Sequence, residues 1–179
     1  VGHIIDLRSL AKLVLNNASL VASIKKEQEI LARNSFMPPK YEEYDSELTC
    51  NPERRRRLLG KLRFEIGVDD FTVSKRSADQ KYVGVYITFT NIPLKKRLRR
   101  QDIYLLSIFS RSKMKAVGAS INDVMQPIVD AMYDLDQIGI DVDYKTSNNR
   151  TERINIKGAL SAISGDNLGL YTSQLILHI

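Results

Sequence analysis

Apolar residues over the first 33 positions recur every three or four residues, the spacing expected of amphipathic helices. The polar stretch Asn16-Asn17-Ala18-Ser19 interrupts this pattern, and Ser19 is a candidate N-cap for a second helix. Pro38-Pro39 then ends the second helix, because the residue before a proline disfavours the helical conformation. The pattern predicts two short helices, followed by a polar linker over residues 37–53.

After this linker the apolar pattern changes to strict alternation. Every second residue over positions 62–68 is apolar, which predicts a strand that ends at the adjacent carboxylates Asp69 and Asp70. Residues 82–89 and 103–109 are apolar almost throughout, which is typical of strands covered on both faces.

A helical pattern returns at about residues 123–138, where apolar residues again form one stripe. Asn122 or Ser120 is expected to cap this helix, and Gly139 is expected to end it. Pro127 is tolerated only in the first turn of a helix, which favours a later start.

The last expected strand covers residues 154–163 and is broken at Gly158. The polar residues 141–153 before it are expected to form the tip of a hairpin, and a glycine-rich turn holding Asp166 follows it. The order strand, strand, strand, helix, strand predicts an α/β fold with a mixed sheet and a crossover helix. An acid lies at the end of the first and of the last strand.

Composition indicates a globular protein with a basic surface. The 179 residues are 43% hydrophobic, enough for one domain with its own core and an appended N-terminal segment. The net charge of +6 favours a polyanionic partner such as nucleic acid. The single cysteine, Cys50, excludes an internal disulfide and a cysteine-based zinc cluster. No apolar run reaches the roughly 18 residues that a membrane span needs.

Asp69 and Asp166 are the candidate metal ligands. Two-metal phosphoryl transfer needs neighbouring carboxylates that hold Mg²⁺ or Mn²⁺ ions about 4 Å apart, and adjacent parallel strands that end in acids supply them. The alternation places Asp70 on the apolar face and Asp69 on the opposite one, so Asp69 is preferred and Asp70 is the fallback. The alternative is that these acids only open turns, where Asp is common.

Three stretches of the sequence resemble a group of animal proteins derived from transposons. Residues 68–73 read VDDFTV, residues 82–93 read YVGVYITFTNIP, and residues 158–169 read GALSAISGDNLG. In this order they are similar to DNA transposases of the CACTA (En/Spm) superfamily, over about residues 60–170. Plant members have Asp-Gly where this chain has Asp69-Asp70.

The resemblance implies a ribonuclease-H-like fold, with a helical arm and basic linker over residues 1–57 and the front part of a catalytic core over residues 58–179. It implies an Asp-Asp-Glu/Asp triad in which Asp69 is the first acid and Asp166 the second. The implied activity is cutting and rejoining of DNA with Mg²⁺ or Mn²⁺, by attack of water or a 3′-hydroxyl on phosphate. The third acid is expected beyond this chain, which reads as an inactive fragment.

Two runs of basic residues are the expected contacts to DNA phosphates, and such runs also serve as nuclear import signals. The runs are Arg54, Arg55, Arg56 and Arg57, and Lys95, Lys96, Arg97, Arg99 and Arg100. They are extended by Lys61, Arg63, Arg111, Lys113 and Lys115. DNA is therefore the expected partner and the nucleus the expected location, with neither a membrane nor a small-molecule substrate. The alternative for each residue is an exposed charge without a partner.

Five aromatic residues of the apolar strands, Tyr82, Tyr86, Phe89, Tyr104 and Phe109, raise the question of base stacking. Because they lie in apolar strands, packing in the core is expected instead.

Two other functions stay open. A non-catalytic descendant of the same fold would bind DNA or further copies of itself without a metal. A protein-interaction module would use its basic charge only for solubility, and would bind no DNA at moderate salt.

Overall fold

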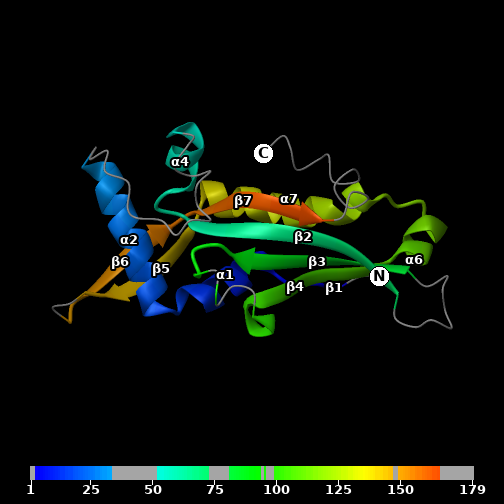
Figure 1. Ribbon diagram of the computed structural model, residues 1–179, viewed down its shortest axis with the longest axis horizontal. Coiled ribbons are helices and arrows are strands. Elements are labelled where there is room, and N and C mark those ends of the chain that lie inside the picture. The colour runs from blue at the N-terminus through cyan, green and yellow to red at the C-terminus, as the bar shows by residue number, and fades with distance from the viewer. Residues whose placement is uncertain are drawn as a thin grey trace.

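The computed structural model describes residues 3–33, 52–72, 81–93, 95, 99–146 and 149–165. The strands are β1 (His3–Ile4), β2 (Leu62–Thr72), β3 (Lys81–Phe89), β4 (Ile103–Ser110), β5 (Ile140–Lys145), β6 (Thr151–Ile156) and β7 (Gly158–Gly165). The helices are α1 (Leu7–Leu15), α2 (Ala18–Ala32), α4 (Pro52–Leu58), α6 (Arg111–Ala116) and α7 (Ile121–Gln137), with a short 3-10 turn at Arg100–Asp102. The predicted α/β class is confirmed (Figure 1).

The main sheet has the strand order β1-β4-β3-β2-β7. The two-residue strand β1 lies at one edge, and β2, β3 and β4 form an antiparallel meander. The chain then crosses over through α7, and β7 pairs with β2 in parallel. This is the mixed sheet with a crossover helix that the order of the elements predicts.

One face of this sheet, here called the core face, carries Phe64, Ile66 and Val68 of β2, all buried. Buried residues of α1, α2 and α7 belong to the same hydrophobic cluster. Figure 1 shows α1 and α7 behind the sheet, so the core lies between them and the strands. The N-terminal helices therefore contribute to the core of the sheet.

The break between the two N-terminal helices is confirmed, but the predicted cap at Ser19 is wrong. Ser19 lies inside α2, and Asn17 caps the helix, because its side-chain oxygen accepts the backbone N–H of Ser19 at 3.1 Å. Asn is as good an N-cap as Ser, and only the residue with extended backbone geometry can fill the position.

The helix α7 begins at Ile121, so the later start that Pro127 suggested is wrong. Ser120 and Asp123 form a capping box, in which each side chain accepts the other residue's backbone N–H. This cap fixes the start of the helix, and Pro127 is accommodated in the second turn, where it removes one backbone hydrogen bond.

The expected strand over residues 154–163 is two strands that belong to different sheets. β6 pairs with β5 in a separate antiparallel hairpin, and β7 joins the main sheet. Gly158 begins β7 because α7 approaches it closely: a Cβ there would lie 2.5 Å from the Leu135 side chain. The polar residues 141–153 alternate in exposure and supply the strands of this hairpin as well as its tip.

A buried ion pair fastens α2 to the first long strand. Arg63 of β2 and Glu27 of α2 are 5% and 7% exposed, and an Arg63 guanidinium nitrogen lies 3.2 Å from a Glu27 carboxylate oxygen. The Glu27 carboxylate also accepts the backbone N–H of Gly60 at 2.9 Å. Removing Glu27 would take this ion pair away from a buried guanidinium, which is a costly change.

Replacing Glu27 with alanine is therefore expected to lower the free energy of unfolding by about 3–5 kcal/mol. The matched control is Arg153→Gln, since Arg153 pairs with Asp141 on the surface, where the two side chains are 73% and 50% exposed. That change is expected to cost less than about 1 kcal/mol. Urea unfolding of both variants checks this, and equal effects would contradict it.

Candidate functional site

Asp69 lies near the end of β2 on the face opposite the core, and it is exposed. We call this the open face; on β2 it carries Glu65, Gly67, Asp69 and Phe71. The Cα partner of Asp69 on β3 is Gly84. At the other end of this face α4 packs on β7, where Leu58 and Ala159 form a small buried cluster. Toward Asp69, Figure 1 shows no described helix in front of β2, β3 and β4.

Asp70 points to the other side and is engaged by a guanidinium. Two nitrogens of Arg111 contact its two carboxylate oxygens, at 2.6 Å and 3.3 Å. This two-point ion pair attaches the start of α6 to the end of β2. Asp70 therefore has a structural partner, whereas Asp69 forms no ion pair with another described residue.

The second candidate ligand, Asp166, lies outside the described residues. The residue before it, Gly165, is the parallel partner of Val68, the residue before Asp69. Within the described ranges no three His, Cys, Asp or Glu side chains gather in a metal-binding group.

A β-bulge sets this parallel register. Phe64 pairs with Leu160, but Glu65 pairs with Ala162, so Ser161 is the extra residue in β7. The Ser161 hydroxyl donates to the Phe64 carbonyl at 2.9 Å, so a side chain joins the two strands at the irregularity. Without the bulge, Val68 would pair with Ser164 instead of Gly165.

Several of the predicted DNA-binding residues lie at the end of the sheet far from Asp69. The helix α4, which contains Arg54 to Arg57, directly precedes β2, and Asp69 lies about 23 Å along the strand from Leu62 at ~3.3 Å per residue. The β3–β4 connection with Lys95 and Arg99 begins at the same far end, since Phe89 pairs with Phe64.

The structure describes only part of these basic runs. Arg56, Arg57, Lys95 and Arg99 are exposed. The positions of Lys96 and Arg97 and the side chains of Arg54, Arg55 and Arg100 lie outside the described part.

Two basic residues of the same end are engaged inside the protein. Arg63 is buried against Glu27, and the Lys61 Nζ atom lies 2.5 Å from a carboxylate oxygen of Asp136 on α7. Both side chains therefore have an acidic partner within the protein, and neither needs DNA as a partner.

Further basic residues near the Asp69 end of β2 lie on α6, a helix that the sequence pattern did not predict. It is only six residues long, begins at its N-cap Ser110, and starts with the Arg111 that pairs with Asp70. Lys113 and Lys115 on this helix are exposed. A six-residue helix without buried residues leaves no apolar periodicity, but its three basic residues in five positions were visible in the sequence.

The expectation that the strand aromatics pack in the core is correct for three residues and wrong for two. Phe89 and Phe109 are buried, and Tyr104 packs edge-on against Phe89. Burial raises the pKa of the Tyr104 phenol, and the nearby Asp102 charge adds to the effect. Tyr82 and Tyr86 instead lie on the open face and are partly exposed, because alternation within one strand sends neighbouring aromatics to opposite sides.

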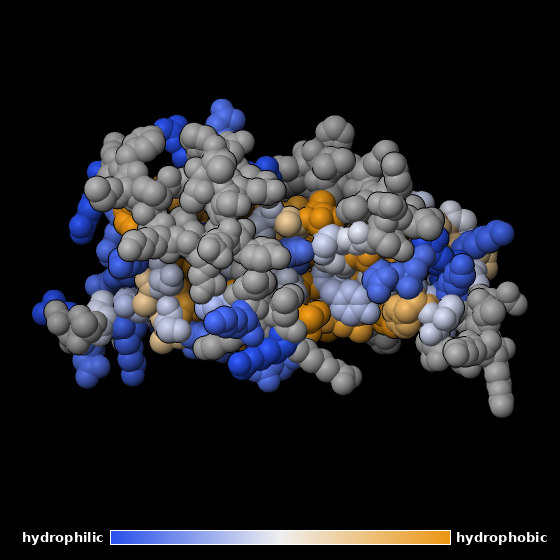
Figure 2. Space-filling view, viewed as in Figure 1, coloured by the Kyte–Doolittle hydropathy of each residue, from blue (hydrophilic) through white to orange (hydrophobic). Residues whose placement is uncertain are grey.

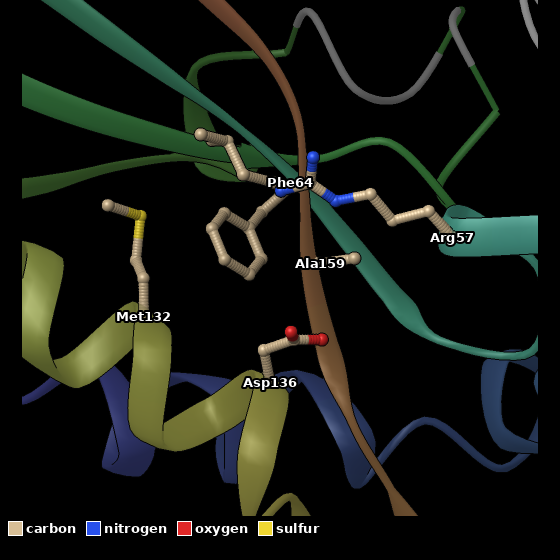
Figure 3. A pocket seen from close by; sticks show the side chains of 6 residues that line it. Arg57, Phe64, Met132, Asp136 and Ala159 are labelled. Atoms are coloured by element: carbon tan, nitrogen blue, oxygen red, sulfur yellow. The ribbon is translucent and has the colours of Figure 1, made fainter. Parts of the chain in front are cut away.

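A small cavity lies at the far end of the sheet, between α4, α7 and β7. Figure 3 shows Arg57, Phe64, Met132, Asp136 and Ala159 around it, with Phe64 and Met132 forming its apolar wall. Its volume of ≈ 10 Å³ gives room for about one water molecule. It is therefore too small for a substrate.

No family model, curated protein or solved structure matches the chain. Among the described residues, no helix is both long and apolar enough to cross a membrane.

The two adjacent aspartates are expected to differ in their effect on stability. Asp70→Asn weakens the ion pair with Arg111. Because both side chains of this pair are about a third exposed, the change is expected to lower the free energy of unfolding by about 0.5–1 kcal/mol. Asp69→Asn alters an exposed side chain, and a change within about 0.5 kcal/mol is expected. Thermal and urea unfolding check the order; a larger loss for Asp69→Asn would contradict it.

Proposed function

We propose that this chain is part of a ribonuclease-H-like core that cleaves and rejoins DNA, with Asp69 and Asp166 holding Mg²⁺ or Mn²⁺. The observation that carries the proposal is the parallel register of β2 and β7, in which the residue before each acid pairs with the residue before the other. Continued by one residue, this register would bring the two carboxylates together at the end of the sheet.

The strand order supports the fold assignment. A ribonuclease-H-like core begins with a three-stranded antiparallel meander, and the strand after the first helix returns in parallel beside the first strand. The succession β2, β3, β4, α7, β7 with the order β4-β3-β2-β7 follows that scheme. The hairpin of β5 and β6 is an insertion between the helix and the returning strand.

The surroundings of the acids support the choice of Asp69. Its carboxylate is exposed on the open face, where a metal ion and a phosphate can reach it. The carboxylate of Asp70 is occupied by Arg111, whose positive charge would oppose a cation at the same oxygens.

The chemistry follows from this arrangement. Asp69 and Asp166 on neighbouring strands would hold divalent ions beside a phosphodiester, and such ions would supply charge stabilisation to the reaction. An oxygen of water or of a 3′-hydroxyl attacks phosphorus while the bond to the leaving oxygen breaks. DNA is then the substrate and the nucleus the expected location. A non-catalytic descendant would keep the fold and the basic residues, but its binding would not depend on Asp69.

Mn²⁺ titration by calorimetry tests the metal site. The wild-type chain is expected to bind Mn²⁺ weakly, and Asp69→Asn and Asp166→Asn are each expected to abolish the heat of binding, because each removes one of the shared ligands. The matched control is Asp130→Asn, which removes an exposed carboxylate of α7 from the covered side of the sheet. Equal binding by the wild type and both site variants would contradict the proposal and favour the non-catalytic alternative.

A further inference from the structure

We propose that Phe71, Tyr82 and Tyr86 form a binding surface for an unpaired strand of DNA, whose bases stack on their rings. We call these three residues the aromatic stripe. The choice of DNA rests on the proposed function, but the stripe itself rests on the geometry of the open face. If the aromatic stripe binds unpaired bases, the DNA near Asp69 is a single strand or an opened duplex end.

The three rings share one face and one neighbourhood. Phe71 and Tyr82 are Cα partners across β2 and β3, and their rings stack at 5.9 Å between centroids. Tyr82 and Tyr86 are separated by four residues of β3, about 13 Å at ~3.3 Å per residue. All three side chains are partly exposed, which leaves ring surface for a ligand.

The ring of Tyr86 lies over Gly84, on the side toward Tyr82 and opposite Asp69. A Cβ on Gly84 would lie 2.7 Å from the Tyr86 hydroxyl oxygen and 2.8 Å from two ring carbons. The ring therefore lies over the Gly84 backbone, on the open face, and directly across the strand pair from Asp69. Tyr86 is partly exposed in this position, and the exposed part of its ring is surface on which a base can stack.

The charges around the stripe fit a phosphate backbone. The stripe ends at α6, since Tyr82 is the Cα partner of Ser110, the N-cap of that helix. Lys113 and Lys115 are exposed there, while Arg111 is engaged by Asp70. Figure 2 shows the same side of the molecule, with apolar and pale residues toward the middle and blue, hydrophilic residues toward the edge.

The open face also carries the acids Glu65 and Asp69, which repel phosphates. Binding of a single strand is therefore expected to strengthen when Mg²⁺ is added, because the ion offsets these charges.

Fluorescence anisotropy with a labelled twelve-nucleotide single strand of thymidines, in Mg²⁺, tests the stripe. Tyr86→Leu and Tyr82→Leu are each expected to raise the Kd about tenfold, since a stacked base contributes on that scale. Tyr86→Phe keeps the ring and is expected to bind as the wild type does. The control is Tyr133→Leu, which alters an exposed tyrosine of α7, on the covered side of the sheet.

The lysines are tested through salt dependence. Lys113→Gln combined with Lys115→Gln is expected to reduce the slope of log K against log[salt] by about 0.7 per lysine, the value for single strands. Arg56→Gln combined with Arg57→Gln, at the far end of the sheet, is expected to leave the slope for this short strand unchanged.

Two results would overturn the inference. One is an unchanged Kd for Tyr82→Leu and Tyr86→Leu; if one of them does not fold, as judged by thermal melting, the other decides. The second is tighter binding of the matched duplex than of the single strand. Neither result bears on the proposed metal site, because Mn²⁺ titration of Asp69→Asn tests that site in the absence of DNA. A different outcome is also possible, in which the tyrosine variants bind DNA more weakly but Asp69→Asn binds Mn²⁺ as well as the wild type does. That outcome would contradict the proposed function and leave the aromatic stripe supported.

Discussion

The parallel pairing of β2 with β7 is the constraint on which the candidate site depends. β7 reaches β2 only after the crossover through α7 and the hairpin of β5 and β6, and Gly158 allows close packing of β7 against Leu135. The bulge at Ser161 then advances the register by one residue, with the Ser161 hydroxyl bonded to the Phe64 carbonyl. Every pairing beyond the bulge, up to Val68 and Gly165, follows from that single extra residue.

The two faces of the sheet differ in how far helices cover them. The core face is covered by α1 and α7, and the buried Glu27–Arg63 pair adds α2 to the same unit. The open face is left to Asp69 and the partly exposed rings of Phe71, Tyr82 and Tyr86. Most of the buried core therefore lies on one side of the strands. The residues proposed for chemistry and binding lie on the other side, away from the end where α4 packs on β7.

Much of this arrangement was predictable from alternation alone. The period-two pattern from Leu62 to Val68 gave the strand and assigned Asp69 and Asp70 to opposite faces, as observed. A hairpin tip was expected within residues 141–153, but the strands β5 and β6 were not, because their residues alternate in polarity without a strong apolar signal. The helix α6 was missed because it buries nothing. Tyr82 and Tyr86 were assigned to the core because a mostly apolar strand hides which of its faces is uncovered. Which face is uncovered depends on how helices elsewhere in the chain pack on the sheet.

Disulfide formation between positions 69 and 166 would show whether these two positions lie side by side, as the candidate site requires. Asp69→Cys and Asp166→Cys would be combined with Cys50→Ser, so that no other thiol is present. A disulfide requires Cα atoms about 4.4–6.8 Å apart, which neighbouring strands provide. Mild oxidation is expected to form an intramolecular disulfide, seen as faster migration on a non-reducing gel. Two thiols that stay free under these conditions would contradict it.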